Sequence, residues 1–286
     1  IKNKIQNNSI MSSKKNISHH YDIGNDLYGK MLDKHMQYTC AYFNKPNMTL
    51  DEAQYAKMML IAKKLDLKQN MVILDIGCGF GSMAQFLAKH YGVYVIGVTL
   101  SKKQKYYADK YFSHPNVTIK LKDYRHVSGQ FDRVYSVGMF EHVGRRNYKE
   151  YYDKCYDLLK SNGIMLIHTI GTNTRKWSHN SFINKYIFPE GELPHIENLT
   201  HSFIDKWHLE DWQNMGLSYA KTLRAWHKNI GDWSGLENYN NRFRRMWNFY
   251  LLGCAANFQY RGICLWQIVY TKRNSNRNDD CHYIRN

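Results

Sequence analysis

The run at residues 73–81, Ile-Leu-Asp-Ile-Gly-Cys-Gly-Phe-Gly, constrains the fold of this chain more than any other stretch. An apolar strand carrying an acidic residue leads into a glycine-rich turn, and a helix-like segment follows at 82–88. This order is typical of the first strand, loop and helix of a nucleotide-type α/β domain. An ordinary turn does not need three glycines at alternate positions, whereas a backbone that approaches a ligand closely does. We therefore predict a ligand site here, with Asp75 placed to meet a positively charged group.

Strand-like and helix-like segments alternate along most of the chain, which predicts a doubly wound, mostly parallel sheet. Ligands of such sheets bind beyond the carboxyl ends of the strands. The expected strands are 71–76, 93–98, 117–121, 131–137, 163–168 and 263–271, and the expected long helices are 51–66 and 239–260.

The alternation of strands and helices stops between Phe182 and Gly216. We expect a helical lid insertion at about 178–216 within one catalytic domain that spans 18–272. Residues 1–17 are rich in Asn, Lys and Ser and are expected to be a disordered leader, and 273–286 a flexible tail.

The net charge of +16 favours an anionic partner, either nucleic acid or an anionic membrane surface. The six Cys form no C-x-x-C pair and no cluster with metal-ligand spacing, so we expect reduced cytosolic thiols and no metal. No run of eighteen apolar residues and no apolar N-terminal core segment is present, which argues against a membrane span and a signal peptide.

The spacing of the glycines narrows the choice of ligand. An NAD site would have G-x-G-x-x-G and an acidic residue after the second strand, but here Gly-x-Gly-x-Gly is followed by Thr99 and Gln104. No Walker lysine follows the loop either. The short loop fits S-adenosylmethionine, with Thr99 and Gln104 as hydrogen-bonding partners of the ribose. At the third strand end, Asp123 can accept from the adenine amino group and Tyr124 can stack on the ring.

Beyond the glycine loop, three runs are more specific: Gln-Tyr-Thr-Cys-Ala-Tyr-Phe at 37–43, Met-Phe-Glu-His-Val-Gly at 139–144 and Asn-Lys-Tyr-Ile-Phe-Pro at 184–189. With them the chain closely resembles the cyclopropane-fatty-acid synthases, including the mycolic acid cyclopropane synthases, from His19 to about Lys272. The resemblance implies a seven-stranded, Rossmann-like class I S-adenosylmethionine-dependent methyltransferase. It also implies the reaction: the methyl of S-adenosylmethionine goes to a cis double bond of a phospholipid acyl chain, and the carbocation loses a proton to bicarbonate and closes to a cyclopropane.

The resemblance also assigns residues. Glu141, His168 and Tyr219 would hold bicarbonate through side chains, and Cys40 and Ile170 through backbone groups. Cys254 matches a cysteine once proposed as a nucleophile, although its apolar helix favours packing beside the acyl chain. Asp75 and Asp123 join the cofactor set from their positions at strand ends. The cofactor positions given by the resemblance are Tyr21, Tyr38, Thr39, Gly77, Gly79, Thr99, Leu100, Gln104, Tyr124 and Arg125.

The partner implied is an unsaturated phospholipid at an anionic membrane, with no nucleic acid, in an enzyme peripheral to the inner face of the membrane on its cytoplasmic side. A homodimer is also expected. Many phospholipid enzymes of this family carry an additional N-terminal domain that these 286 residues do not contain. Two alternatives remain open: a small-molecule N-methyltransferase on the same scaffold, and a nucleic-acid-binding protein or RNA methyltransferase, favoured by the charge and by Arg242, Arg244 and Arg245 beside aromatic residues.

Overall fold

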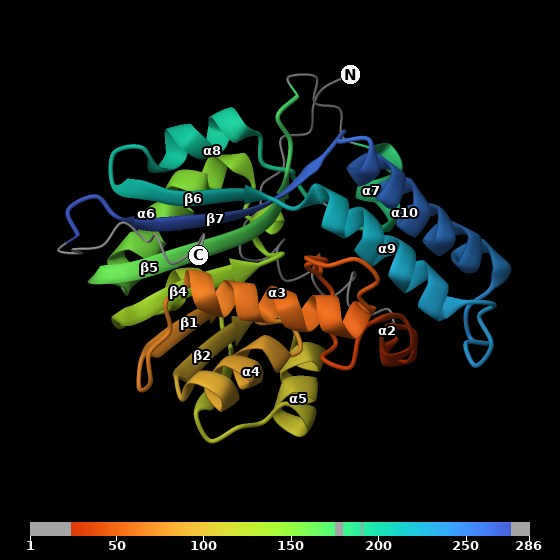
Figure 1. Ribbon diagram of the computed structural model, residues 1–286, viewed down its shortest axis with the longest axis horizontal. Helices are drawn as coiled ribbons and strands as arrows, with labels where there is room; N and C mark the ends of the chain where they lie inside the picture. Colours follow the sequence, from red (N-terminus) through yellow and green to blue (C-terminus); the bar gives the residue numbers. More distant parts are fainter. Residues whose placement is uncertain (1–23, 175–179, 190, 276–286) are drawn as a thin grey trace.

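The computed structural model describes residues 24–174, 180–189 and 191–275 (Figure 1). The strands are β1 (Val72–Ile76), β2 (Tyr94–Thr99), β3 (Val117–Leu121), β4 (Phe131–Val137), β5 (Leu159–Gly171), β6 (Trp207–Asn214) and β7 (Cys264–Lys272). The α-helices are α2 (Asn25–Met31), α3 (Leu50–Lys64), α4 (Ser82–Tyr91), α5 (Lys102–Tyr111), α6 (Tyr148–Leu158), α7 (Ser181–Tyr186), α8 (Ile196–Phe203), α9 (Gly216–Ile230) and α10 (Asn241–Gln259). Short 3₁₀ turns are η1 (Tyr124–His126), η2 (Phe140–His142) and η3 (Arg145–Asn147).

The strands form one seven-stranded sheet in the order β3-β2-β1-β4-β5-β7-β6. The pairs from β3 to β5 are parallel, and β7 runs antiparallel between β5 and β6. The predicted fold class, a doubly wound and mostly parallel sheet of seven strands, is confirmed. Because parallel strands end at the same edge, the turns after β1, β2, β3 and β4 meet there.

Both faces of the sheet are covered by helices (Figure 1). On one face α3, α4 and α5 pack over strand residues such as Ile73, Val95 and Leu166. On the other face α6 and α8 pack over residues such as Leu74 and Ile167. The alternation of neighbouring residues between the two faces explains why these central strands are apolar at nearly every position.

A third apolar cluster lies beyond the carboxyl ends of the strands, where α2, α9 and α10 pack together. Its largest fully buried side chains include Trp226 on α9 and Trp247 on α10. In Figure 1 these helices stand beside the strand ends and extend away from the sheet. The cluster therefore builds a second body of structure next to the edge where the glycine turn lies.

The predicted segments agree with the observed ones to within a few residues, except that β5 begins earlier than the expected strand at 163–168. The insertion predicted at 178–216 contains, in its described residues, two helices, α7 and α8, and one strand, β6. Its first part contains α7, and its last part is β6, an edge strand that pairs with β7. The leader at 1–17, Tyr21, residues 175–179 and most of the tail lie outside the described residues. Among the helices that the structure describes, none is both long enough and apolar enough to span a bilayer.

Candidate active site

The glycine turn after β1 adopts a conformation that other residues rarely reach. Gly77 and Gly79 have φ values of +82° and +54°. A Cβ at Gly77 would lie 2.6 Å from Cγ of Met139, whereas a Cβ at Gly79 would have no atom within 4 Å. Gly77 is thus required by close packing, and Gly79 leaves open the space in front of the turn.

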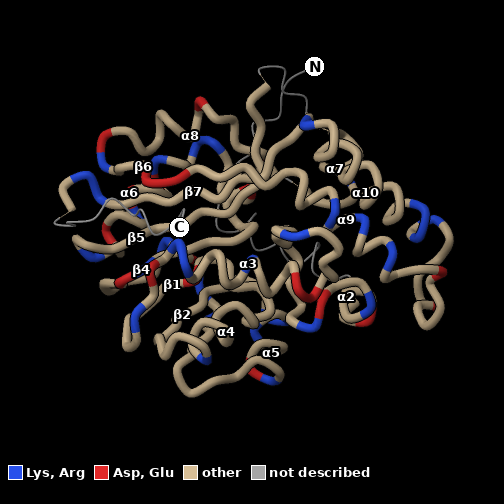
Figure 2. Tube along the Cα trace, viewed as in Figure 1, with Lys and Arg blue, Asp and Glu red and all other residues tan. Residues whose placement is uncertain are grey.

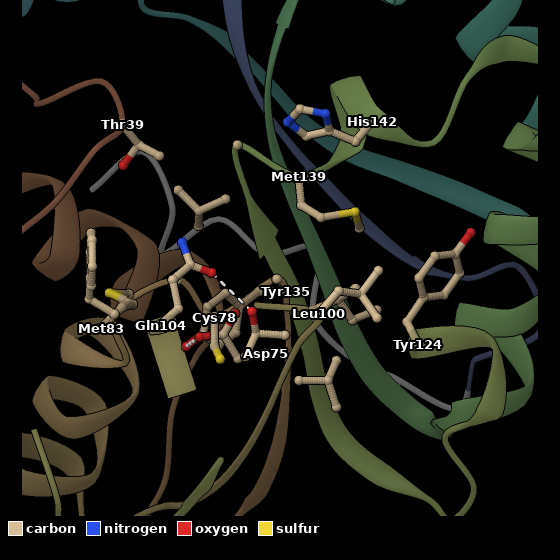
Figure 3. Close-up of a pocket in the computed structure, with 18 of the residues that line it drawn as sticks. Thr39, Asp75, Cys78, Met83, Leu100, Gln104, Tyr124, Tyr135, Met139 and His142 are labelled. Atoms are coloured by element: carbon tan, nitrogen blue, oxygen red, sulfur yellow. Dashed lines mark hydrogen bonds between the residues drawn. The ribbon is translucent and has the colours of Figure 1, made fainter. Parts of the chain in front are cut away.

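That space is a cavity of about 150 Å³, called the first cavity here (Figure 3). Figure 3 shows residues from several elements around it, with Asp75 of β1, Gln104 of α5 and Tyr124 of η1 among them. Every predicted cofactor residue among the described ones lines it: Tyr38, Thr39, Asp75, Gly77, Gly79, Thr99, Leu100, Gln104, Asp123, Tyr124 and Arg125.

Asp75 is the principal charge in this cavity that a cationic ligand could use. It is 3% exposed, and the Tyr135 hydroxyl donates to its Oδ2 at 2.7 Å. Burial raises the pKa of Asp75 to about 7, although the bond from Tyr135 opposes that shift. A cationic group bound beside it would favour the ionised form.

Four other polar side chains of the first cavity are joined in two pairs. Thr99 donates to Oε1 of Gln104 at 2.9 Å, so the two candidate ribose partners are linked to each other. Arg125 donates through Nε and Nη2 to both oxygens of Asp123, at 2.9 and 2.8 Å. Burial alone would raise the pKa of Asp123, but these bonds outweigh it and lower the pKa. Each pair is thus held in a fixed orientation by its own hydrogen bonds.

A second cavity of about 590 Å³ lies beside the first. It is walled by α7, α9 and α10 and by the turns after β4 and β5, and much of its lining is aromatic or aliphatic. Four of the predicted catalytic residues line it: Glu141, Ile170, Tyr219 and Cys254.

Glu141 lies in the turn η2 that follows β4. Its Oε1 accepts from the Ile170 backbone N–H at 2.7 Å, and its Oε2 is buried without a partner among the described residues. The Ile170 N–H thus holds Glu141 in place, and the role of an Ile170 backbone group toward bicarbonate stays a prediction. Burial raises the pKa of Glu141 to about 7, against the lowering effect of that hydrogen bond. A protonated Glu141 can donate from the second oxygen.

His168 and Cys40 are buried but are not among the residues that line the second cavity. His168 Nδ1 lies 3.1 Å from Nε2 of Gln267, and its Nε2 is buried without a partner in the described part of the chain. Burial, followed by the nearby Lys57 and Lys64, holds the pKa of His168 well below its usual range, so the ring is neutral.

The thiols give no sign of nucleophilic activation. Burial raises the pKa of Cys40 far above its usual range, and its Sγ lies 3.1 Å from the Ala41 carbonyl oxygen. Burial likewise raises the pKa of Cys254 to about 12. Since the thiolate is the reactive form, packing is the better interpretation of Cys254.

The two cavities share part of their walls: Tyr38, Thr39, Gly138 and His142 line both. We call these four residues the window. His142 belongs to the specific run at 139–144 and Gly138 directly precedes that run, but no role was predicted for either residue. Burial lowers the pKa of His142 to about 4, which keeps its ring neutral. The sequence feature that could have identified them is their position in the segment that follows β4 and contains Glu141.

Two features decide whether the expected small molecules fit. For S-adenosylmethionine, the open space at Gly79 and the buried Asp75 suit a close-lying ligand with a positive charge. For bicarbonate, Glu141 Oε2 at the second cavity is a buried oxygen without a partner among the described residues, which a small hydrogen-bonding ion could satisfy. His168 Nε2 is buried without a described partner as well, although His168 does not line that cavity. The residues present therefore fit both groups. In the described residues no three His, Cys, Asp or Glu side chains gather in an arrangement suited to a metal ion.

Comparison with known proteins gives one consistent family. Mycolic acid cyclopropane synthetase matches residues 8–268. Cyclopropane-fatty-acyl-phospholipid synthase of Escherichia coli is 46% identical over 255 residues, which are 88% of this chain, and the chain spans 66% of that relative's length.

Solved structures agree with this match. The cyclopropane synthase MmaA2 from Mycobacterium tuberculosis superimposes with a TM-score of 0.85 at 30% identity, over 90% of this chain and 97% of that one. Mycolic acid cyclopropane synthase CmaA1, in complex with SAH and CTAB, superimposes with a TM-score of 0.84 at 30% identity, over 91% and 98% of the two chains.

Proposed function

The chain belongs to the mycolic acid cyclopropane synthetase family, and from that premise we propose that it converts cis double bonds of phospholipid acyl chains to cyclopropane rings. The observation that carries the proposal is the pairing of the two cavities across the window, with a buried, half-partnered Glu141 on the far side. When bound, S-adenosylmethionine supplies the methyl group and bicarbonate the base that takes a proton from the carbocation of the acyl chain.

The residues of the first cavity would hold the methyl donor. Asp75 offers a carboxylate to its cationic end, and Thr99 and Gln104 offer hydrogen-bonding groups at the next strand end. Tyr124 is an aromatic wall, with the Arg125 guanidinium 5.4 Å from its ring centre. Because an alkene is a poor nucleophile, these contacts would serve mainly to keep the donor close and in line with the acyl chain.

The residues of the second cavity would protect and deprotonate a cationic acyl chain. Tyr38, Tyr219, Tyr250 and Phe258 place aromatic faces around it, and such faces stabilise positive charge. Burial keeps the Cys254 thiol protonated, so the strongly nucleophilic thiolate is not formed beside the cation. Glu141 Oε2 and His168 Nε2 would hold bicarbonate, and a proton on Glu141 would be shared with it.

The opening of the second cavity suits a membrane partner. Phe249 lines the cavity and is 62% exposed, and it packs on Phe182 with ring centres 4.9 Å apart. Further exposed side chains lie on the same two helices and just after α10. The aromatic and aliphatic ones are Tyr186, Leu252 and Tyr260, and the basic ones are Lys185, Arg242 and Arg245. Figure 2 shows Lys and Arg positions along α9 and α10. Aromatic and basic side chains together favour an anionic lipid surface.

A vesicle assay tests the proposal. Purified protein with S-adenosylmethionine, bicarbonate and anionic vesicles of monounsaturated phospholipid is expected to raise the acyl mass by one CH2 and to consume the double bond. Methylation of small amines with unchanged lipids would support the N-methyltransferase alternative. Binding of RNA in preference to the vesicles at one salt concentration would support the nucleic-acid alternative. Assembly as a homodimer stays a prediction.

A further inference from the structure

Lys57 of α3 is a lysine with no exposed surface, and the reaction scheme above gives it no part. Its ammonium group donates to Oε1 of Gln37 at 2.5 Å and to Oγ1 of Thr39 at 2.8 Å. A buried charge is costly, so a fold that keeps one needs close partners for it. Both partners here belong to a single short segment, 36–41, that crosses between the two cavities.

The same helix face also holds the backbone of that segment. Gln54, one helical turn before Lys57, donates through Nε2 to the carbonyl oxygens of Gln37 and Thr39, at 3.2 and 2.9 Å. The side chain of Gln37 reaches onward, because its Nε2 donates to Ser82 Oγ at 2.6 Å at the start of α4. Segment 36–41 is therefore bound to α3 and connected to the helix that follows the glycine turn.

The contact with Thr39 fixes a side chain of the window. While Thr39 Oγ1 accepts from Lys57, its Cγ2 points at Gly138, where an added Cβ would lie only 2.8 Å from it. Thr39 and Gly138 line both cavities. A different rotamer of Thr39 would turn the methyl away and leave the ammonium with Gln37 Oε1 as the remaining acceptor of the two. The width of the window thus depends on the hydrogen bond from Lys57.

We propose that Lys57 is a positioning residue for methyl transfer, which locks Gln37 and Thr39 so that the window keeps a fixed width. The proposal rests on the proposed function. Lys57 lines neither cavity, so its positioning role is exerted through Gln37 and Thr39. Burial lowers the pKa of Lys57 to about 8, and the nearby carboxyl of Asp33, which accepts from the backbone N–H of His35 and of Gln37, opposes that shift.

The chain offers a matched control in Lys64. It lies on the same helix, is 1% exposed, and pairs with Asp211 at 2.9 Å and Gln213 at 2.7 Å, away from the window. Lys57→Met and Lys64→Met each remove one buried ammonium group and keep a side chain of similar length. Loss of stability is expected from both variants, but loss of positioning only from Lys57→Met.

The first readout needs no activity. Hydrogen–deuterium exchange of the full chain should show the amides of 37–41 exchanging about tenfold faster in Lys57→Met and unchanged in Lys64→Met. Equal protection of 37–41 in Lys57→Met and the wild type would overturn the proposal. So would an equal increase in both variants. Because this readout does not depend on lipid turnover, an inactive wild type would refute the proposed function alone.

The second readout is a split between kcat and KM in the vesicle assay. Lys57→Met should lower kcat about 30-fold while KM for lipid and Kd for SAH change less than about threefold. If Lys57→Met does not fold, Thr39→Val removes the acceptor and keeps the shape, and its kcat should fall about tenfold. A kcat within about twofold of the wild type in Thr39→Val would overturn the proposal.

Discussion

The two cavities each contain one buried carboxyl group whose pKa is raised to about 7, yet they are built differently. The first cavity is formed mainly by turns at the ends of parallel strands, and Thr99 with Gln104 and Asp123 with Arg125 form hydrogen-bonded pairs in it. The second is formed mainly by helices beyond the sheet, and it keeps an unpartnered oxygen on Glu141. From this comparison we expect different roles for the two carboxyl groups: Asp75 binds the methyl donor, and Glu141 holds the base that takes the proton.

Replacing Glu141 by Gln should give the largest effect. The variant keeps the size of the side chain but removes the acid proton, so bicarbonate would lose its partner and kcat should fall by about 100-fold or more. Calorimetry should find the Kd for SAH within about threefold of the wild type, because Glu141 does not line the first cavity. Glu150→Gln, an exposed change on α6, is the control and should leave both values unchanged. Equal losses of turnover and of SAH affinity would contradict separate roles for Asp75 and Glu141.

Gly79→Ala should show the opposite pattern. Its Cβ would enter the open space of the first cavity, and we expect SAH to bind about 30-fold more weakly. Gly235 is a matched control, since it also has a positive φ, +74°, with no atom near an added Cβ. Both changes should cost on the order of 1 kcal/mol of stability from backbone strain. If Gly235→Ala weakened SAH binding as much, strain rather than occupation of the cavity would be the cause.

The pH dependence of SAH binding should distinguish the two carboxyl groups. Asp75 must ionise to attract the cationic end of the ligand, so affinity should rise about tenfold between pH 6 and 8, around its pKa of about 7. The rise should vanish in Asp75→Asn and persist in Glu141→Gln. The same raised pKa makes the unliganded fold less stable as pH rises through 7, because the unfolded chain ionises Asp75 at lower pH. A pH-independent Kd in the wild type would contradict this role.

Cys254→Ala should give the smallest effect. Burial keeps the thiol protonated, and the side chain only lines the second cavity, so kcat should change less than about threefold. Cys155→Ala, on α6 in the cluster that covers one face of the sheet, is the control for a buried thiol removed away from the cavity. A loss of about 100-fold confined to Cys254→Ala would restore the interpretation of this residue as a nucleophile.

The first cavity could be predicted from the sequence far better than the second. Glycine spacing and strand ends are local signals, and the topology of parallel sheets brings Asp75, Thr99 and Tyr124 to one edge. The second cavity depends on long-range packing of α7, α9 and α10, and its residues came only from the resemblance. The hydrogen bond from Ile170 to Glu141 joins residues 29 positions apart, and the one from Lys57 to Thr39 joins residues 18 positions apart. No periodic pattern in the sequence predicts such contacts.

Strand β6 is an example in the fold of a feature that the local sequence does not predict. Trp207–Asn214 contains His, Glu, Asp, Gln and Asn, so its composition does not suggest a strand. It becomes one because β7 presents a free edge, and because Asp211 is paired with Lys64 of α3. Contacts with distant parts of the chain thus determine the strand conformation of this segment, as they determine the hydrogen-bond partner of Glu141.

The central claim is that a methyl group crosses the window and then loses a proton in the second cavity. The most direct test supplies S-adenosylmethionine with a fully deuterated methyl group to the wild type and monounsaturated phospholipid vesicles. The account predicts acyl chains heavier by CD2, with the double bond consumed, because one deuteron leaves to the base. Products that retain all three deuterium atoms, or deuterium that appears only on small amines, would contradict it.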